Sequence, residues 1–418
     1  MTTSRVAFYL TCASVISILV GIAYSQILLG LAIAALLISG DRLRFPPIKL
    51  PLAIFIGWTI LAVALSPDPR GGTPQIRKMI LFLILLLVAS AFRTLAEIRA
   101  VVILWAVTAT ASALVSFFQF WRKYQEAKAL HRGFYDYYVS SRITGFTSHW
   151  MTFGGEEMMV ALMLLAFLLF SRHRKWKPLG WACLAILGVS LVLGWDRSIF
   201  LLGMPLGVCY LVWFWNWRLL LLAPVVLGAA LLIAPMRERI FSAFEPHGQT
   251  DSNMHREILR RTGVRIIEAH PFFGLGPEQL KPPPGEPTSP AFDRYIPKDV
   301  PRPLPEGWYG HLHNIYLQYP AERGIPALLA LLWMIGVMAR DFIVALRRRD
   351  LDPETRFVLH GAIAVIIGVL AEGYFEYNLG DSEVLTIFLT VTAMGYVALW
   401  ATPVKTPVIP SEAAKVAG

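Results

Sequence analysis

The sequence consists largely of apolar runs of about 20 residues, the length that crosses a lipid bilayer as a helix. Apolar residues make up 56% of the 418 and charged residues only 16%, whereas about a quarter of the residues in a soluble domain are charged. The runs begin near Val6, Ser25, Lys49, Met79, Ala100, Glu156, Leu179, Ile199, Leu219, Asn314, Phe357 and Glu383. They predict an all-α integral membrane protein with about twelve transmembrane helices.

The chain is expected to form a single polytopic membrane domain over residues 1–418. It contains no repeat of fixed period and no matched pair of interrupted helices, which would indicate an inverted-repeat transporter. The first run has only Arg5 ahead of it and lacks a small-residue cleavage site, so we expect a retained helix rather than a signal peptide. An even number of helices places both termini on the same side of the membrane.

Lysine and arginine indicate the orientation, because they concentrate in short cytoplasmic loops. They cluster at residues 42–49, 172–177 and 340–356, all on the side of the N-terminus, which is therefore predicted to be cytoplasmic. Two longer segments, 122–155 and 236–312, fall on the other side. In a bacterial cell this orientation corresponds to the inner membrane, with the longer segments in the periplasm.

The net charge of +10 does not indicate a nucleic-acid partner, because much of the excess lies in the orienting loops. The remainder lies in the outward segments, where it suits membrane lipids, phosphate or pyrophosphate. The three cysteines, Cys12, Cys183 and Cys209, all lie inside apolar runs. A disulfide framework or a thiolate metal site is therefore not expected.

The longer outward segment, 236–312, has its own organisation. The stretch MHREILRRTGVRIIEA has the pattern of an amphipathic helix lying along the membrane surface, with Asp251 or Ser252 as its cap. Gly274 and Gly276 follow, and they allow the backbone to approach another element closely. The proline-rich residues after Lys281 cannot form a regular helix, and they could act as a flap over a site.

Ionisable residues avoid the centres of the predicted helices and gather near their outward ends. A transporter or proton pump would place such groups nearer the membrane midplane. The residues concerned are Glu156, Glu157, Asp196, Arg197, Glu372 and Glu376. This distribution predicts a polar pocket at the outer membrane surface, where a lipid headgroup and a water-soluble group could meet.

Four arginines on outward segments are candidates for binding phosphate: Arg142, Arg197, Arg261 and Arg265. A guanidinium group can hold phosphate oxygens through two parallel hydrogen bonds. Each could instead contact lipid headgroups or a carboxylate. Arg197 is distinctive, because it and Asp196 occupy a turn of about two residues between two apolar helices, where solvent is scarce.

His313 opens the stretch HNIYLQYPAERG, where the long outward segment enters a helix. Its unperturbed pKa allows it to act as a general base, although a histidine at a helix entrance can also be purely structural. His311 lies two residues earlier, but no third ligand with metal-site spacing accompanies the pair, so no metal is expected. Glu322 and Gly324 lie in the same stretch.

Together these segments resemble the O-antigen ligase and polymerase superfamily, membrane enzymes that share a Wzy-type core. The matching segments are RITGFTSHWMTFG from Arg142, DRSIFLLG from Asp196, REILRRTGVRIIEAHPFFGLGPEQL from Arg256 and HNIYLQYPAERGIPALL from His313. They cover about residues 142–330. The first segment departs from the family pattern, since Ser148, His149 and Trp150 stand where a Pro-Asn pair is usual.

The resemblance implies a membrane glycosyltransferase of GT-C-like architecture that needs no metal or other cofactor and inverts the anomeric centre. The donor would be a glycan on undecaprenyl pyrophosphate. Arg197 and Arg265, with Arg142 and Arg261, would stabilise the leaving pyrophosphate, and His313 would act as general base. Asp196, Glu322, Gly324, Gly274 and Gly276 would have supporting roles.

Three functions are considered: two enzymes of this superfamily that differ in their acceptor, and one protein outside it that makes no bond. A ligase transfers the O-antigen to the lipid A core, whereas a polymerase transfers it to another lipid-linked repeat. We favour the ligase, because the chain has one dominant outward segment and matches closely around His313. A lipid or polysaccharide flippase is a further alternative, but it would need a polar path through helices whose centres carry almost no charge.

Overall fold

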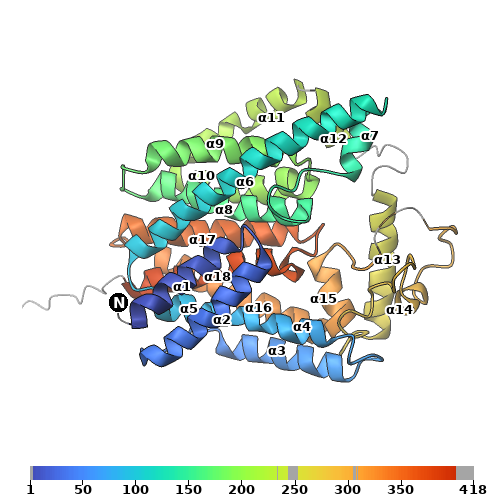
Figure 1. Cartoon of the computed structure of the whole chain (residues 1–418), viewed down its shortest axis with the longest axis horizontal. Helices are drawn as coiled ribbons and strands as arrows, with labels where there is room; N and C mark the ends of the chain where they lie inside the picture. The colour runs from blue at the N-terminus through green and yellow to red at the C-terminus, as the bar shows by residue number, and fades with distance from the viewer. Residues whose placement is uncertain (1–2, 233, 243–252, 305–306, 308, 402–418) are drawn as a thin grey trace, which may run out of the picture.

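The computed structural model describes residues 3–232, 234–242, 253–304, 307 and 309–401 (Figure 1). The chain is 74% helical and the described residues contain no strand, which confirms the predicted all-α fold. Most helices run along a common direction, while α13 (Asn253–Ala269) lies across one end of the bundle (Figure 1). The first helix, α1 (Thr3–Ser17), begins near the opposite end.

Eight helical stretches of the described chain are long and apolar enough to cross a bilayer, so the chain is a multi-pass membrane protein. They are α2 (Ile22–Ser39), the continuous α4, η1 and α5 (Thr73–Ala91), α6 (Leu95–Ala129), α8 (Trp150–Phe170), Ile199–Val225, α16 (Ile325–Leu346), α17 (Pro353–Glu372) and α18 (Ser382–Ala401). Two shorter helices, α3 (Lys49–Ala64) and α9 (Lys177–Leu193), are also apolar.

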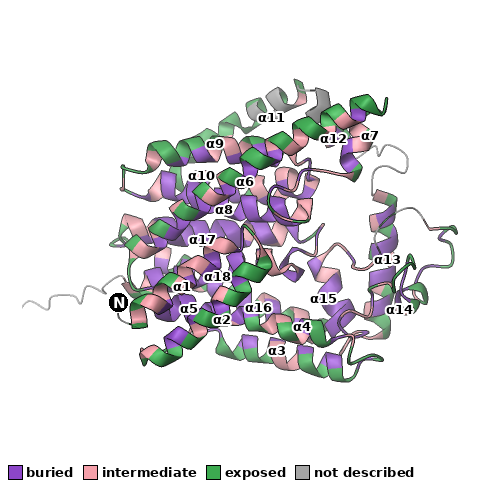
Figure 2. Ribbon diagram, in the orientation of Figure 1, coloured by how far each residue is buried: buried purple, intermediate pink, exposed green. Residues whose placement is uncertain are grey.

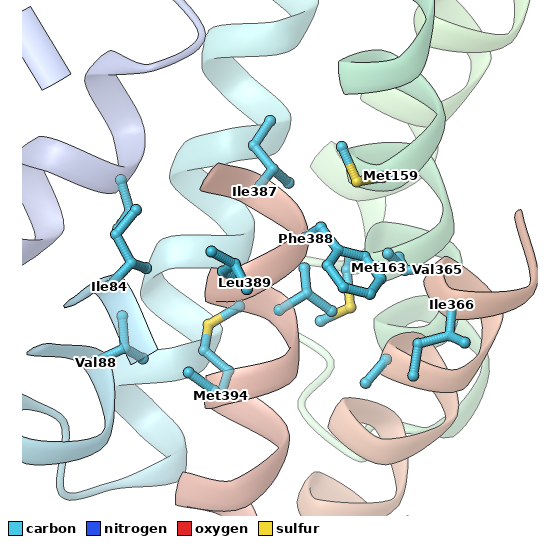
Figure 3. Close-up of a cluster of buried hydrophobic side chains, with 14 of the residues drawn as sticks. Ile84, Val88, Met159, Met163, Val365, Ile366, Ile387, Phe388, Leu389 and Met394 are labelled. Atoms are coloured by element: carbon cyan, nitrogen blue, oxygen red, sulfur yellow. The ribbon is translucent and has the colours of Figure 1, made fainter. Parts of the chain in front are cut away.

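Helices α8, α17 and α18 form the centre of the bundle (Figure 2). In α8, 89% of the apolar window is buried inside the protein, against 28% in α2, so the first is enclosed by other helices and the second faces outward. Met163 of α8 and Phe388 of α18 meet in this core near Val365 of α17 (Figure 3). A glycine allows close packing beside it: a Cβ on Gly203 would lie 3.0 Å from the carbonyl oxygen of Gly368 in α17.

Two of the predicted apolar runs are interrupted. The run from Asn314 divides into α15 (Ile315–Arg323) and α16, because Gly324 between them has a φ of +81°. The run from Ile199 contains the π-helix η2 (Ile199–Gly203) and α10 (Met204–Asn216), and is followed by η3 (Trp217–Leu222) and α11 (Ala223–Leu232). The outward segment 122–155 is largely helical, since α6 continues to Ala129 and is followed by α7 (Phe134–Ser140).

The predicted amphipathic helix is present as α13, between the short helices α12 (Ala234–Phe241) and α14 (Pro290–Asp293). Its expected caps, Asp251 and Ser252, lie outside the described residues. The apolar face of α13 is buried against the outward segment itself and not against lipid, because it shares a cluster with Leu275, Phe292 and Leu312. The proline-rich stretch thus contributes packed side chains to this cluster.

Candidate active site

His313, Glu376 and Arg256 form a hydrogen-bonded chain beside α13. The Nδ1 atom of His313 lies 3.0 Å from Oε2 of Glu376, and Arg256 donates to the other carboxylate oxygen over 2.6 Å. The side chains of His313 and Glu376 are only 11% and 3% exposed. One buried carboxyl group therefore joins an imidazole to a guanidinium.

Residues at the end of α17 hold these three hydrogen-bonded side chains in place. Asn314 caps α15 by accepting hydrogen bonds from the amides of Tyr316 and Leu317, and it donates to the carbonyl of Tyr374 just beyond α17. The amide of Ile315 donates to the carbonyl of Gly373 over 2.8 Å. These bonds place His313 directly against Glu376, which follows α17 by a few residues.

His313 itself has a left-handed backbone conformation, with a φ of +47°. For a residue with a side chain this conformation costs on the order of 1 to 3 kcal/mol and persists only where its surroundings impose it. The hydrogen bonds of Asn314 and Ile315 impose it here. Such outliers concentrate at functional sites, which adds weight to His313 as a functional residue.

Burial favours the neutral form of both members of the His313–Glu376 pair. It raises the pKa of Glu376 to about 8, against the opposing charge of Arg256. It also lowers the pKa of His313 well below the usual value, and the neighbouring Arg256 and His255 lower it further. A neutral His313 has a ring nitrogen available to accept a proton.

Two arginines converge on the carbonyl oxygen of Trp195. Arg142 donates to it over 3.4 Å and Arg239 over 3.0 Å. Burial, followed by the charge of Arg239, lowers the pKa of the Arg142 guanidinium to about 10. The Arg142 guanidinium also lies 5.2 Å from the ring centre of Trp150, one of the residues that depart from the family pattern. An anion near this carbonyl would be attracted by two positive charges.

Arg197 connects the turn before η2 to the segment around α13. It donates to the carbonyl oxygen of Ser242 over 2.6 Å and to the side-chain oxygen of Asn253 over 2.9 Å. Asp196 takes no part in this link: one of its carboxylate oxygens accepts from the amide and the hydroxyl of Ser198, at 3.1 and 2.6 Å. The charged pair thus fixes the turn between two membrane helices.

Arg261 and Arg265 lie on the side of α13 opposite Arg256, as five- and nine-residue separations on a helix require. Arg261 pairs with Asp299 over 2.8 Å. Arg265 is exposed. The pKa of Asp299 is lowered by the hydrogen bond from Arg261 and by the positive charges of both arginines. The structure therefore brings Arg142 within electrostatic range of Glu376 but places Arg261 and Arg265 on a different face of α13 from Arg256.

Glu322, Gly324, Gly274 and Gly276 lie together at the joint between α15 and α16. Glu322 is buried against Arg323 at 2.9 Å, and its other oxygen accepts from the backbone amide of Glu278. The amides of Leu275 and Gly276 donate to the carbonyls of Ala321 and Glu322. The joint thereby anchors the outward segment to the membrane helices.

A polar cavity of about 580 Å³ lies next to this chain of residues. Its wall includes His311, whose ring centre is 4.0 Å from that of His313, and Glu376. The remaining wall comes from α4, the start of α8, the turn η4 (Asn378–Gly380) and the start of α18. Within the described residues, no group of three or more His, Cys, Asp or Glu is placed to hold a metal ion.

A comparison with known families identifies the core of this site. Residues 182–332 match the family model described as O-antigen ligase. This part of the chain is therefore similar to the O-antigen ligase family. No curated protein matches the chain.

The matched part of the chain includes Arg197, Arg256 and His313 but neither Arg142 nor Glu376. Sequence reasoning did not select Arg256, Arg239 or Glu376 as site residues. Glu376 was noticeable only as one of several acidic residues near outward helix ends. Its contact with Arg256 joins positions 120 residues apart, and no local pattern reveals such a contact.

Proposed function

We propose that the protein is an O-antigen ligase that transfers a polysaccharide from undecaprenyl pyrophosphate to the lipid A core in the periplasm. The reaction inverts the anomeric centre and uses no metal ion. The observation that carries the proposal is the His313–Glu376–Arg256 chain beside the arginines that converge on Trp195. This arrangement supports a mechanism in which a proton acceptor works beside groups that stabilise a leaving anion.

In this mechanism His313 removes the proton from the acceptor hydroxyl as the oxygen attacks the anomeric carbon. Its Nδ1 faces Glu376, so Nε2 is the atom that takes the proton. Glu376 orients the ring and stabilises the imidazolium that forms. Arg256, bonded to Glu376, links this pair to the positively charged part of the site.

The pyrophosphate leaves as an anion, and the arginines supply the compensating charge. Arg142 and Arg239 are preorganised by their shared carbonyl, and such fixed donors stabilise a developing charge strongly in a site with little water. Arg197 is proposed to stabilise the leaving pyrophosphate together with these two arginines. Arg261 and Arg265 remain predicted pyrophosphate ligands. At Arg261 a pyrophosphate would have to replace Asp299.

The proposed topology retains the twelve transmembrane helices and GT-C-like architecture. The helices α1, α3 and α9 would cross the bilayer, and the stretch from Ile199 would supply two crossings, the second beginning near Leu219, with both termini in the cytoplasm and the enzyme in the inner membrane. Residues 236–312 would then form the periplasmic loop, with the proline-rich part covering the site as a flap. The side that carries His313 would face the periplasm.

An in vitro transfer assay tests the proposal. Purified protein, lipid-linked O-antigen and lipid A core should give a product of slow mobility on a gel. His313→Ala should lower the rate by about a hundred- to ten-thousand-fold, the usual effect of losing a general base, while His173→Ala should leave it unchanged. Elongation of the lipid-linked glycan without transfer to the core would make the protein a polymerase. Near-normal turnover by His313→Ala would remove His313 from the mechanism.

A further inference from the structure

The cavity beside His313 has a strongly acidic wall. Six carboxyl groups line it, those of Glu278, Glu322, Glu372, Glu376, Asp381 and Glu383. The lining includes Lys78 and Lys281, but no arginine of the described chain. The lining therefore offers no guanidinium group to hold an anion such as pyrophosphate, whereas carboxyl groups and amides are suitable acceptors and donors for sugar hydroxyl groups.

Several of these groups are fixed but retain hydrogen-bonding capacity. Asp381 accepts a hydrogen bond from Thr152 through one oxygen at 2.8 Å. Glu372 is 0% exposed and accepts from Asn378 through Oε2, while its Oε1 atom has no hydrogen-bond partner among the described residues. A buried oxygen of this kind is costly unless it is satisfied. A bound hydroxyl could satisfy it.

The position of the cavity relative to the arginines indicates which sugar it holds. In an inverting displacement the attacking oxygen and the leaving pyrophosphate lie on opposite sides of the anomeric carbon. The arginines, which suit the pyrophosphate, lie outside the cavity. Glu376 touches both regions, because it contacts Arg256 and also lines the cavity.

We propose that this cavity is the acceptor subsite and binds a neutral or amine-bearing sugar through its hydroxyl groups. The inference rests on the proposed function and adds the location and chemistry of acceptor binding. One acceptor hydroxyl oxygen forms the new bond to the anomeric carbon, and its proton passes to His313. The bond from that carbon to the pyrophosphate oxygen breaks, and the electron pair leaves with the pyrophosphate.

Direct binding tests the subsite without turnover. Saturation-transfer NMR would follow a delipidated core oligosaccharide, with inorganic pyrophosphate as a second probe. Asp381→Asn and Glu383→Gln should each weaken oligosaccharide binding about tenfold, as expected for losing a hydrogen bond to a charged group. Ser148→Trp, which places a large ring at the cavity wall, should abolish it. Pyrophosphate binding should stay unchanged in all three.

Glu268→Gln is the matched control, because it removes an exposed carboxylate from the outward segment but lies outside the cavity. Thermal melting in detergent identifies any of the three cavity variants that fails to fold. The cavity variants that do fold are then compared with the wild type. Equal oligosaccharide binding in wild type and folded variants would overturn the proposal, as would a selective loss of pyrophosphate binding. Oligosaccharide binding that depends on Asp381 and Glu383, without glycan transfer by the wild type, would refute the ligase function but retain the subsite.

Discussion

Glu376 is the residue on which the protonation state of the site depends. Its pKa of about 8 means that it is mostly protonated below that pH and ionised above it. Only the ionised form can stabilise a positively charged His313. The pKa of His313 is lowered, so this residue stays neutral and able to accept a proton throughout the range in which Glu376 titrates.

We therefore expect kcat for transfer to rise with pH between about 6.5 and 9, with a midpoint near the pKa of about 8 of Glu376. In Glu376→Gln this rise should disappear and kcat should stay low, because glutamine cannot ionise. A pH profile of kcat at saturating donor and acceptor measures both. Glu257→Gln, which alters an exposed partner of Arg260 on α13, is the control. A rise that persisted in Glu376→Gln would show that another group titrates.

At this scale the sequence indicated single residues but not their partners. His313 was identifiable because a titratable residue stands where a polar segment enters a helix. Glu376 lies 63 positions away and Arg256 lies 120 positions from Glu376, so their contacts arise only from the way in which α13 and α15 pack at the end of α17. The close approach of Arg142 and Arg239 to one carbonyl is likewise a tertiary feature.

At the scale of elements, apolar periodicity predicted the positions of most helices and of α13. It did not predict the break at Gly324, because apolar residues continue through α16 and hide the change of direction. Nor did it reveal that the apolar face of α13 packs on the chain itself, since an amphipathic pattern looks the same for lipid and for protein. Helix boundaries that depend on tertiary contacts are therefore the part that local patterns miss.

Arg197 is an element-scale link between a membrane helix and the outward segment. Lysine in its place cannot bond both Ser242 and Asn253 in the same geometry. We expect Arg197→Lys to lower kcat/KM by about ten- to a hundredfold, the loss typical of a charge-assisted hydrogen bond. Steady-state kinetics of transfer measure this. The variant Arg260→Lys, on the exposed side of α13, should retain wild-type kinetics. Unaltered activity in Arg197→Lys would make the link dispensable.

The joint between α15 and α16 should also be sensitive to substitution of Gly324. A Cβ at this residue would lie 1.8 Å from the carbonyl oxygen of Phe272, and the φ of +81° is unfavourable for alanine. Gly324→Ala should therefore lower the melting temperature in detergent and detach the outward segment. Gly336→Ala in α16 is a matched control, because its Cβ would meet nothing within 4 Å and should be neutral or stabilising. Equal melting of both variants would contradict the tight joint.

For the whole molecule, the distribution of charge separates two chemistries at the end of the bundle that carries α13. The arginines near Trp195 favour an anion, and the acidic cavity favours a neutral or amine-bearing sugar. Helices from distant parts of the chain build the cavity wall, and two of them, α8 and α17, belong to the enclosed core. In the proposed mechanism, two substrates of opposite character would meet at His313.

This separation predicts how the enzyme responds to chelation. If fixed guanidinium groups supply the positive charge for the leaving pyrophosphate, no divalent ion is needed for that purpose. Transfer by the purified protein should then continue at an unchanged rate in about 1 to 10 mM EDTA, well above trace metal levels. High salt should slow it instead, because mobile ions screen attraction between the arginines and the donor. A rate that collapsed in EDTA and returned with added magnesium would mean that a metal supplies the charge assigned to Arg142 and Arg239.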